Sequence, residues 1–320
     1  MPEHPDEPVR HVSPLAQSAY DVLDVAPSAT EEDLRRAFRL ALRLTHPDTG
    51  GDPLRFSAVQ LAWEQVCTVQ RRAAYDAGHA VPGQATASAR STFTAPPARA
   101  HTGDRPRSRA YGHPGGWRRQ KYLAQSREWV GRGGDITDPY DAALVRGLPR
   151  EIRRTLADAL AEEATARTLV GMGIGFTVWH DVATSSPANP ERKIDHVVLC
   201  PTGLFALLSE DFGGAVRVRR GELIGDALAG EHPVHELVSR ARSFSRGLRV
   251  KFTAVMIVLP DDALGEVLMS LGASRGTPAL AVTQSALASL LRRGIDGVAP
   301  IGGNELFETR SRLTAGIRFV

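Results

Sequence analysis

A stretch of unusual composition divides this chain of 320 residues into two parts. Residues 81–134 contain few large aliphatic side chains and many Gly, Pro, Ser and Ala residues. They carry ten basic residues against two acidic ones, a net charge of +8, whereas the whole chain carries +3. Such a segment buries too little apolar surface to offset the entropy lost on ordering. The sequence therefore predicts a disordered lead at 1–13, a folded domain at 14–79, a flexible basic linker at 80–135 and a second folded domain at 136–320.

The composition of the chain indicates a soluble protein with enough apolar residues to form hydrophobic cores. Hydrophobic residues make up 42% of the chain, and no apolar run reaches the roughly 18 residues that a membrane-spanning helix needs, so we expect no membrane partner. The amino terminus is polar and acidic, which predicts that it is no secretory signal. Cys67 and Cys200 are too few for a disulfide framework. Arginine greatly outnumbers lysine, which suits a GC-rich genome, so we expect a cytoplasmic, bacterial protein.

Periodicity in the first domain predicts two amphipathic helices that face each other. Residues 34–45 place apolar side chains on one side of a helix and four arginines on the other, Arg35, Arg36, Arg39 and Arg43. A helix at about 53–70 carries an apolar stripe from Phe56 to Cys67. Pro47 stops the first of the two helices. We therefore expect an antiparallel hairpin in which the apolar faces pair and the arginines stay exposed to water.

The predicted loop of this hairpin reads His46-Pro47-Asp48. With Tyr20-Asp-Val-Leu before the hairpin and Arg72-Ala-Ala-Tyr75-Asp76 after it, the region of about residues 14–78 resembles a J domain of the DnaJ co-chaperone family. That resemblance implies an all-α domain that docks on a DnaK-type ATPase chaperone and accelerates its ATP hydrolysis. The chain departs from many family members at Leu44 and Thr45, which stand where those members have a lysine and an aromatic residue.

The resemblance also assigns partner-binding roles to individual residues. The four arginines would meet an acidic groove of the chaperone and steer association. His46, Pro47 and Asp48 would lie at the junction between the domains of that partner, where a fixed carboxylate can bias a charged network between two states. The chain lacks the Gly/Phe-rich segment and the cysteine-repeat zinc module of full-length DnaJ. We therefore expect the carboxy-terminal domain to supply targeting or client binding.

Hydrophobic patterning after residue 149 predicts an α/β domain with a mostly β first half and crossover helices later. Polar turns such as Pro201-Thr-Gly separate its apolar runs. The expected helices cover about 149–171, 234–248 and 284–293, and the expected strands cover 176–182, 194–200, 204–208, 215–219, 252–259 and 278–282.

Three short motifs in this domain resemble the nuclease-related domain called NERD, whose core is similar to restriction-endonuclease folds. They are Glu162 with Thr165-Ala166, the run Ile194-Asp195-His196-Val-Val, and Gly203-Leu-Phe-Ala-Leu, within a core of about residues 150–295. In such a nuclease, acidic side chains hold a divalent metal that activates water, and a nearby lysine assists. Glu162 and Asp195 stand where two of those acids would be.

A departure from the NERD pattern predicts that the metal site is degenerate. The family's Glu-x-Lys aligns with Leu208-Ser209-Glu210, so an apolar residue replaces a metal ligand and a carboxylate replaces the cation. We therefore expect no catalytic residue, metal or cofactor. Mg²⁺ enters only under the alternative of a metal-dependent nuclease with an accessory J domain, in which Glu210 or Asp211 would substitute as a ligand.

Two further patterns bear on function. The basic linker can bind nucleic acid by charge alone, which leaves a nucleic-acid adaptor as a third hypothesis beside a plain solubilising tether. The pattern Gly272-Ala-Ser274-Arg-Gly276 matches the Gly-x-Ser-x-Gly of hydrolases, but we expect it in a loop that leads into a strand. A nucleophile elbow runs from strand to helix, so this serine is not predicted to be a nucleophile.

Overall fold

The computed structural model describes residues 13–15, 18–46, 53–76, 107–131, 136–185, 188–228 and 230–320. The chain divides into two compact units. The first unit, called the helical unit below, comprises Met1–Thr94 and Trp129–Arg153. The second, called the sheet unit, comprises Ala95–Glu128 and Arg154–Val320.

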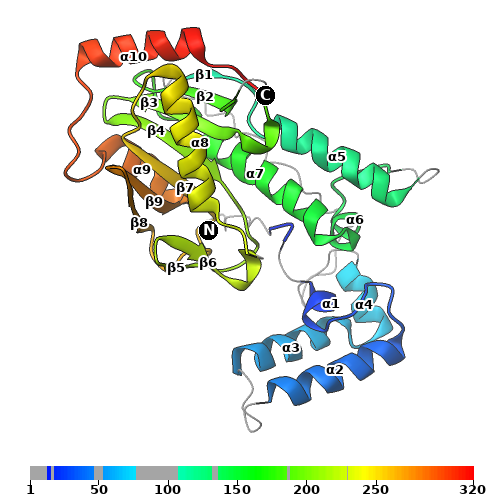
Figure 1. Ribbon diagram of the computed structural model, residues 1–320. Helices are drawn as coiled ribbons and strands as arrows, with labels where there is room; N and C mark the ends of the chain where they lie inside the picture. Colours follow the sequence, from blue (N-terminus) through cyan, green and yellow to red (C-terminus); the bar gives the residue numbers. More distant parts are fainter. Residues whose placement is uncertain are drawn as a thin grey trace, which may run out of the picture. The chain divides into compact units, whose positions relative to one another are not determined.

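Short helices around one small core make up the described part of the helical unit (Figure 1). The core contains buried apolar side chains from the first three helices, among them Leu23, Leu34, Val59 and Val66. The helices are α1 (Ala19–Val22), α2 (Glu31–Thr45), α3 (Pro53–Val66), α4 (Val69–Asp76) and α6 (Ala142–Gly147).

The α2–α3 hairpin expected from the sequence is present. A capping box between Thr30 and Asp33 begins α2, and the helix ends at Thr45, two residues before Pro47. The rings of Phe38 and Trp63 stack with centroids 4.5 Å apart, and those of His46 and Phe56 meet edge to face at 5.2 Å. Because the end of α2 meets the start of α3, the two helices run antiparallel.

A mixed sheet forms the centre of the sheet unit. Its strand order in the described residues is β1-β2-β3-β4-β7-β9-β8, with parallel pairing for β1–β2, β4–β7 and β7–β9 and antiparallel pairing for the rest. A two-stranded ribbon, β5–β6, stands apart. The strands are β1 (Arg109–Tyr111), β2 (Thr177–Val182), β3 (Ile194–Cys200), β4 (Gly203–Ser209), β5 (Arg217–Arg219), β6 (Glu222–Ile224), β7 (Ala254–Leu259), β8 (Leu268–Ser274) and β9 (Thr277–Thr283).

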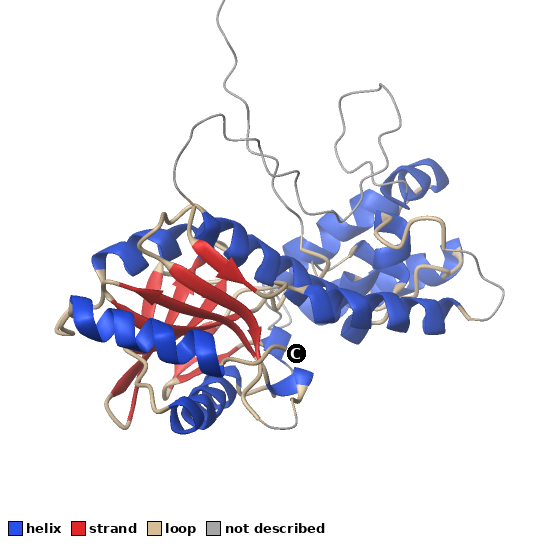
Figure 2. Ribbon diagram, turned by 90° about the horizontal axis from the view of Figure 1, so that it is seen from above, coloured by secondary structure: helices blue, strands red, loops and turns tan. Residues whose placement is uncertain are grey.

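Helices cover both faces of this sheet, as Figure 2 shows from above. One face packs against α8 (Pro233–Leu248) and α10 (Gly303–Gly316), and the other against α9 (Gln284–Arg293) and the end of α7 (Arg150–Val170). β3, β4 and β7 are buried along their whole length because both faces are covered. The result is a mixed α/β fold. The similarity to NERD and to restriction-endonuclease folds stays a prediction.

The prediction of a flexible linker over 80–135 is wrong for residues 109–130. Arg109–Tyr111 form β1, which pairs in parallel with β2, and α5 (Gly116–Val130) is a helix of four turns. Composition indicated too little apolar surface for this segment to order itself, but β2 supplies the backbone partners of β1, and acidic side chains of α7 bind the arginines of α5. Residues 1–12, 80–106 and 132–135 lie outside the described residues.

The expected boundary at residue 136 also differs from the structure. Residues 136–153 group with the helical unit, where Arg146 donates from Nη2 to the carbonyl oxygens of Tyr75 at 3.2 Å and Asp76 at 2.7 Å. These are last-turn carbonyls of α4, which lack partners inside the helix, so a basic side chain from a later segment satisfies them. In the described residues, no helix is both long and apolar enough to cross a membrane.

Most predicted elements of the sheet unit are present within a few residues of their expected bounds, but besides β1 and α5 the sequence did not predict β6, β8 or α10. Strand β8 and helix α10 carry no clear apolar period, since β8 has only one buried position and α10 buries only Leu313. The Gly272–Gly276 pattern lies at the end of β8 and in the turn to β9, a strand-to-strand connection. The expected loop is therefore partly a strand, and Ser274 is not on a strand-to-helix elbow.

Candidate functional site

The candidate partner-binding surface of the helical unit is the outer side of α2. Arg35, Arg36, Arg39 and Arg43 are all exposed, as the helical period predicted. Arg35 pairs with Glu31 at 2.6 Å, and Arg36 lies 3.6 Å from Glu32 and 3.7 Å from Asp33. The first two arginines are therefore offset by the acidic first turn of the helix. Positive charge is concentrated towards its carboxyl end.

His46 is the last described residue before the loop of the hairpin. It is the C-cap of α2 in an extended conformation, and its ring packs against Phe56 at the start of α3. The candidate residues Pro47 and Asp48 lie outside the described residues. The structure thus provides the paired helices under the His-Pro-Asp segment and the position of its first residue.

Hydrogen bonds between α1 and α4 hold the two ends of the DnaJ-like helices together. The Tyr75 hydroxyl accepts from the Ala19 N–H at 2.8 Å, and the Tyr20 hydroxyl donates to Asp76 at 2.7 Å. Arg72 donates from Nε to the Tyr20 hydroxyl at 3.1 Å. Burial and the Asp76 carboxylate raise the pKa of Tyr20 to about 12. These are the residues whose sequence pattern suggested the family, and their contacts here are structural.

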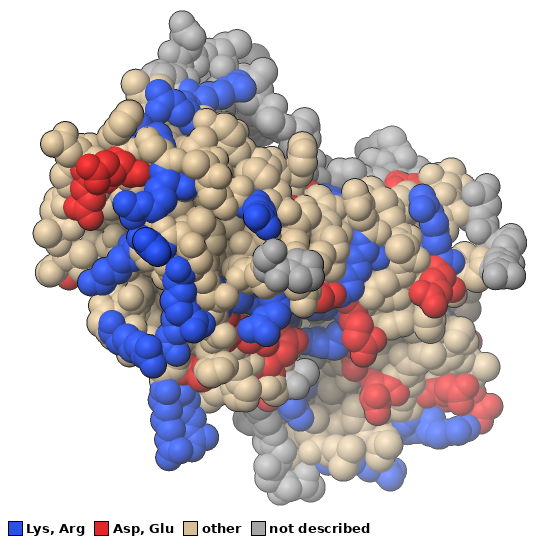
Figure 3. All heavy atoms as spheres, turned by 45° about the horizontal axis from the view of Figure 1, so that its top comes forward, with Lys and Arg blue, Asp and Glu red and all other residues tan. Residues whose placement is uncertain are grey.

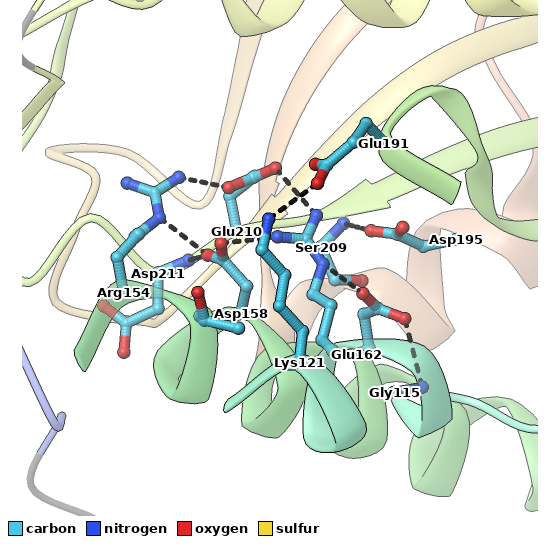
Figure 4. A network of polar contacts seen from close by, with 12 residues as sticks. Gly115, Lys121, Arg154, Asp158, Glu162, Glu191, Asp195, Ser209, Glu210 and Asp211 are labelled. Atoms are coloured by element: carbon cyan, nitrogen blue, oxygen red, sulfur yellow. Dashed lines mark hydrogen bonds and ion pairs between the residues drawn. The ribbon is translucent and has the colours of Figure 1, made fainter. Parts of the chain in front are cut away.

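The sheet unit contains a buried network of charges centred on Lys193. Figure 4 labels Glu162, Asp195 and Ser209 of this network. Lys193 directly precedes β3, and its Nζ donates to Glu162 of α7 at 2.6 Å, to Asp181 of β2 at 2.7 Å and to Asp195 of β3 at 2.8 Å. All four side chains are at least 96% buried. The Gly115 N–H donates to Glu162, and the Ser209 N–H donates to Asp195. Each carboxylate thus has at least one fixed partner.

Two arginines extend the network along α7. Arg118 of α5 lies 2.5 Å from Asp158, 2.6 Å from Glu162 and 3.6 Å from Glu210. Arg154 pairs with Asp158 at 2.8 Å and also with Glu210. The third nuclease candidate, Glu210, therefore binds these two arginines and has no contact with Lys193.

Five largely buried carboxyl groups in this network share three buried or nearly buried cations. Burial first, and then the nearby Asp195 charge, raises the pKa of Glu162 to about 8. Burial and the Glu210 charge raise the pKa of Asp158 to about 7. Burial works against ionised Asp195, but Lys193 and Arg118 outweigh it and lower the pKa of Asp195 to about 2. Protons on two carboxyl groups would bring the charge of the network to zero.

The divalent metal of the nuclease hypothesis would have to bind among these carboxylates. Glu162 and Asp195 lie close together, but the Lys193 ammonium lies among their oxygens and those of Asp181. An ammonium and a divalent cation compete for the same oxygens. Among the described residues, no group of three or more His, Cys, Asp or Glu side chains is arranged to hold a metal. The residues do not fit a metal while Lys193 is in place.

Sequence reasoning missed Lys193, Asp181 and Arg118. Lys193 had a usable signal, because residues two apart on a strand point to one side and Lys193 is two positions before Asp195. Asp181 follows strand alternation poorly because its backbone has a φ of +52°. Arg118 was hidden in the segment expected to be a linker.

A buried histidine pair lies beside the network. The Nδ1 atoms of His180 and His196 are 2.7 Å apart, so one ring donates and the other accepts. Burial and the nearby Lys193 charge lower the pKa of His180 to about 4. Burial, followed by His180, lowers the pKa of His196 well below its ordinary value. Both rings are therefore neutral at pH 7, and we interpret them as a structural link between β2 and β3.

Comparison with known proteins finds relatives for one part of the helical unit. Residues 18–76 match the DnaJ domain family. "DnaJ protein homolog 2" of Allium porrum is 44% identical over 57 residues, which are 18% of this chain and 14% of the relative. "Chaperone protein dnaJ 3" of Arabidopsis thaliana is 40% identical over 57 residues, with the same shares. "Chaperone protein DnaJ" of Geobacillus sp. (strain WCH70) is 36% identical over 69 residues, 20% of this chain and 18% of the relative.

These matches show that the chain carries a DnaJ domain at residues 18–76. J-domain proteins in general partner with Hsp70-type chaperones, the class to which DnaK belongs. The chain matches less than a fifth of the length of the relatives named above. No solved structure matches the chain.

Proposed function

We propose that this protein is a J-domain co-chaperone that binds a DnaK-type chaperone and stimulates its ATP hydrolysis. The observation that carries the proposal is the DnaJ domain at 18–76. In its α2–α3 hairpin, α2 has an exposed basic side and is followed directly by His46-Pro47-Asp48. In this proposal the basic side of α2 attracts an acidic surface of the chaperone. The His-Pro-Asp segment then acts on its nucleotide cycle.

The sheet unit has a binding role in this proposal and selects where or on what the chaperone acts. A role in metal-dependent hydrolysis is less well supported, because Lys193 binds the carboxylates that a metal would need. With purified protein, plasmid DNA and Mn²⁺ we therefore expect no cutting. Cutting that disappears in Asp195→Ala would favour the nuclease alternative.

A single-turnover ATPase assay tests the co-chaperone role. The protein should accelerate ATP hydrolysis by a DnaK-type chaperone, and Asp48→Asn should abolish the acceleration because it removes the carboxylate charge. The matched control is Asp24→Asn, the same chemical change at an exposed position of the same unit. Asp24 has a φ of +55°, which asparagine also adopts readily, so this variant should fold and stimulate normally. Hydrolysis by the chaperone that stays at its basal rate with the wild-type protein would contradict the proposal.

A further inference from the structure

The sheet unit has a pocket of about 350 Å³ between α8 and the tip of the β8–β9 hairpin. One wall comes from the side of α8 that carries Val238 and Ser245, and the opposite wall from Ser274 and Thr277 at the ends of β8 and β9. The segment that leads into β7 forms the base. This volume lies at the lower end of the range typical of ligand pockets. It is enough for one or two side chains of a partner.

The base of the pocket is apolar. Ala241, Phe252 and Val255 line it and are each less than 5% exposed, and Val238 and Val250 are half-buried beside them. Among the described residues, no charged side chain is buried in this base to fix the orientation of a small polar molecule. Such a surface favours the insertion of an apolar side chain.

The rim of the pocket is strongly basic. Arg242, Arg246, Lys251 and Arg275 line it and are all exposed, and none of the described residues that line it is acidic. In the part of the chain that the structure describes, none of the four makes an ion pair. Arg242 donates to the Ser274 hydroxyl, which holds its guanidinium across the pocket mouth. Figure 3 shows basic side chains gathered on the sheet unit, at the left of the view.

A tight backbone turn between β8 and β9 fixes the position of Arg275 on this rim. Arg275 and Gly276 form a two-residue hairpin turn with φ of +51° and +79°. Asparagine or glycine is the favoured residue at the first position of such a turn, and other residues are disfavoured there. The turn places Arg275 at the tip of the hairpin, on the side of the pocket opposite α8; Arg220 and Gly221 form the same kind of turn between β5 and β6, with φ of +52° and +80°.

Three classes of ligand carry the negative charge that this rim would attract. A small organic anion needs buried polar groups to orient it, and the base has none. Single-stranded nucleic acid needs exposed aromatic faces for stacking, and the one aromatic ring that lines the pocket, Phe252, is 3% exposed. A peptide needs an apolar pocket for one anchoring side chain and a charged rim around it, which is the usual anatomy of a protein interface.

We propose that this pocket binds a linear acidic peptide that inserts one apolar side chain between α8 and the β8–β9 turn. The base takes the apolar side chain, and Arg242, Arg246, Lys251 and Arg275 bind the flanking carboxylates. The inference rests on the proposed targeting role of the sheet unit and names the chemistry of its target, an acidic segment of a client or partner.

Fluorescence anisotropy with the full-length protein tests the proposal. The probe is a fluorescein-labelled peptide of Asp and Glu residues around one central Leu. Arg242→Glu should weaken its binding by at least about tenfold, because a like charge then faces the carboxylates. Arg292→Glu, the same change on α9 outside the pocket, should leave the affinity within about twofold. Ser245→Trp fills the pocket without changing charge and should also weaken binding by about tenfold or more.

The remaining probes decide between the ligand classes. A peptide with Ser in place of the central Leu should bind at least about tenfold more weakly. Equal affinity for the two peptides would overturn the proposal, since attraction would then be by charge alone. Tighter binding of oligothymidylate than of the Leu peptide, lost in Arg242→Glu, would overturn it in favour of nucleic acid. ATPase stimulation is measured separately, so a protein that stimulates the chaperone but binds no peptide refutes only this inference.

Discussion

Lys193 acts in this protein as the fixed cation of a site built from carboxylates. Glu162, Asp181 and Asp195 approach its ammonium from three different elements, α7, β2 and β3, at 2.6–2.8 Å. Burial works against an ionised lysine, but Asp195 and Glu162 outweigh it and raise the pKa of Lys193 well above its ordinary value. The ammonium therefore stays charged. It links α7 to β2 and β3 of the sheet.

Removal of the Lys193 ammonium should lower the free energy of unfolding and should allow another cation to bind the carboxylates. Lys193→Ala leaves buried carboxylates without their main partner, so we expect a loss of about 3–5 kcal/mol in the free energy of unfolding. Mn²⁺ should then raise the melting temperature of the variant and leave that of the wild type unchanged. Lys121→Ala, which breaks the exposed pair with Glu191, is the control and should cost less than about 1 kcal/mol. An equal Mn²⁺ shift for wild type and Lys193→Ala would contradict this role of Lys193.

The excess of carboxyl groups in the network predicts an unusual dependence of stability on pH. The pKa of Glu162 is about 8 in the folded chain against an ordinary 4.5, and that of Asp158 is about 7 against 3.8. At a pH between the ordinary pKa of each group and its raised pKa, the group keeps its proton in the folded state and has lost it in the unfolded state. The unfolded state then binds fewer protons, so the free energy of unfolding falls as pH rises from about 5 to about 7.

Glu162→Gln isolates one of these protons. In chemical denaturation at a series of pH values, the decline of the wild type over about pH 5 to 7 should become shallower in the variant. The difference should be about 1.4 kcal/mol per pH unit, the value for one proton. An unchanged slope would mean that Glu162 is ionised in the folded protein at these pH values.

At the scale of the element, α2 separates its charges along its length. Glu31, Glu32 and Asp33 occupy its first turn, where they favour the positive end of the helix dipole. They also offset Arg35 and Arg36. The carboxyl half of α2 itself carries no acidic residue, so no carboxylate of the helix stands beside Arg39.

Charge reversal along α2 should therefore depend on position. Arg39→Glu should lower the rate of association with the DnaK-type chaperone more than Arg35→Glu does, by about tenfold at low salt. The difference should shrink as ionic strength rises, because screening weakens the attraction between exposed charges. Stopped-flow or surface-binding kinetics at several salt concentrations would measure it. Equal effects of the two variants at low salt would show that the separation of charge along α2 has no part in docking.

Local pattern accounts for the elements that were predicted correctly. The 3.6-residue period of α2 and the capping box at Thr30 depend on neighbours in sequence, and so do the apolar runs of β3, β4 and β7. The bond from Arg146 to the last turn of α4 joins residues 70 positions apart, and no local pattern reveals it. The sequence also singled out Glu162 and Asp195, which the structure brings to one lysine. The identity of their cation depended on how β2, β3 and α7 meet in space.

At the scale of the whole molecule, the sheet unit includes residues that come before residue 136, where composition placed its start. β1 lies at one edge of the sheet beside β2, and α5 places Arg118 against Asp158, Glu162 and Glu210. Composition measures whether a segment can form a core of its own. It does not measure whether another part of the chain offers it a strand edge and a set of buried carboxylates.

Two fragments of the sheet unit test this arrangement. A fragment that begins at residue 107 keeps β1 and α5, whereas one that begins at residue 136 follows the composition boundary and removes both. The shorter fragment should lose about 3–5 kcal/mol of unfolding free energy from the buried ion pairs of Arg118 alone, and more from the exposed edge of β2. Both fragments lack the DnaJ domain, so the comparison of their melting and denaturant midpoints isolates β1 and α5. Arg118→Met in the longer fragment should reproduce a large part of the loss, because it leaves the same carboxylates unpaired. Equal midpoints for the two fragments would mean that residues 107–135 add nothing to the stability of the sheet unit.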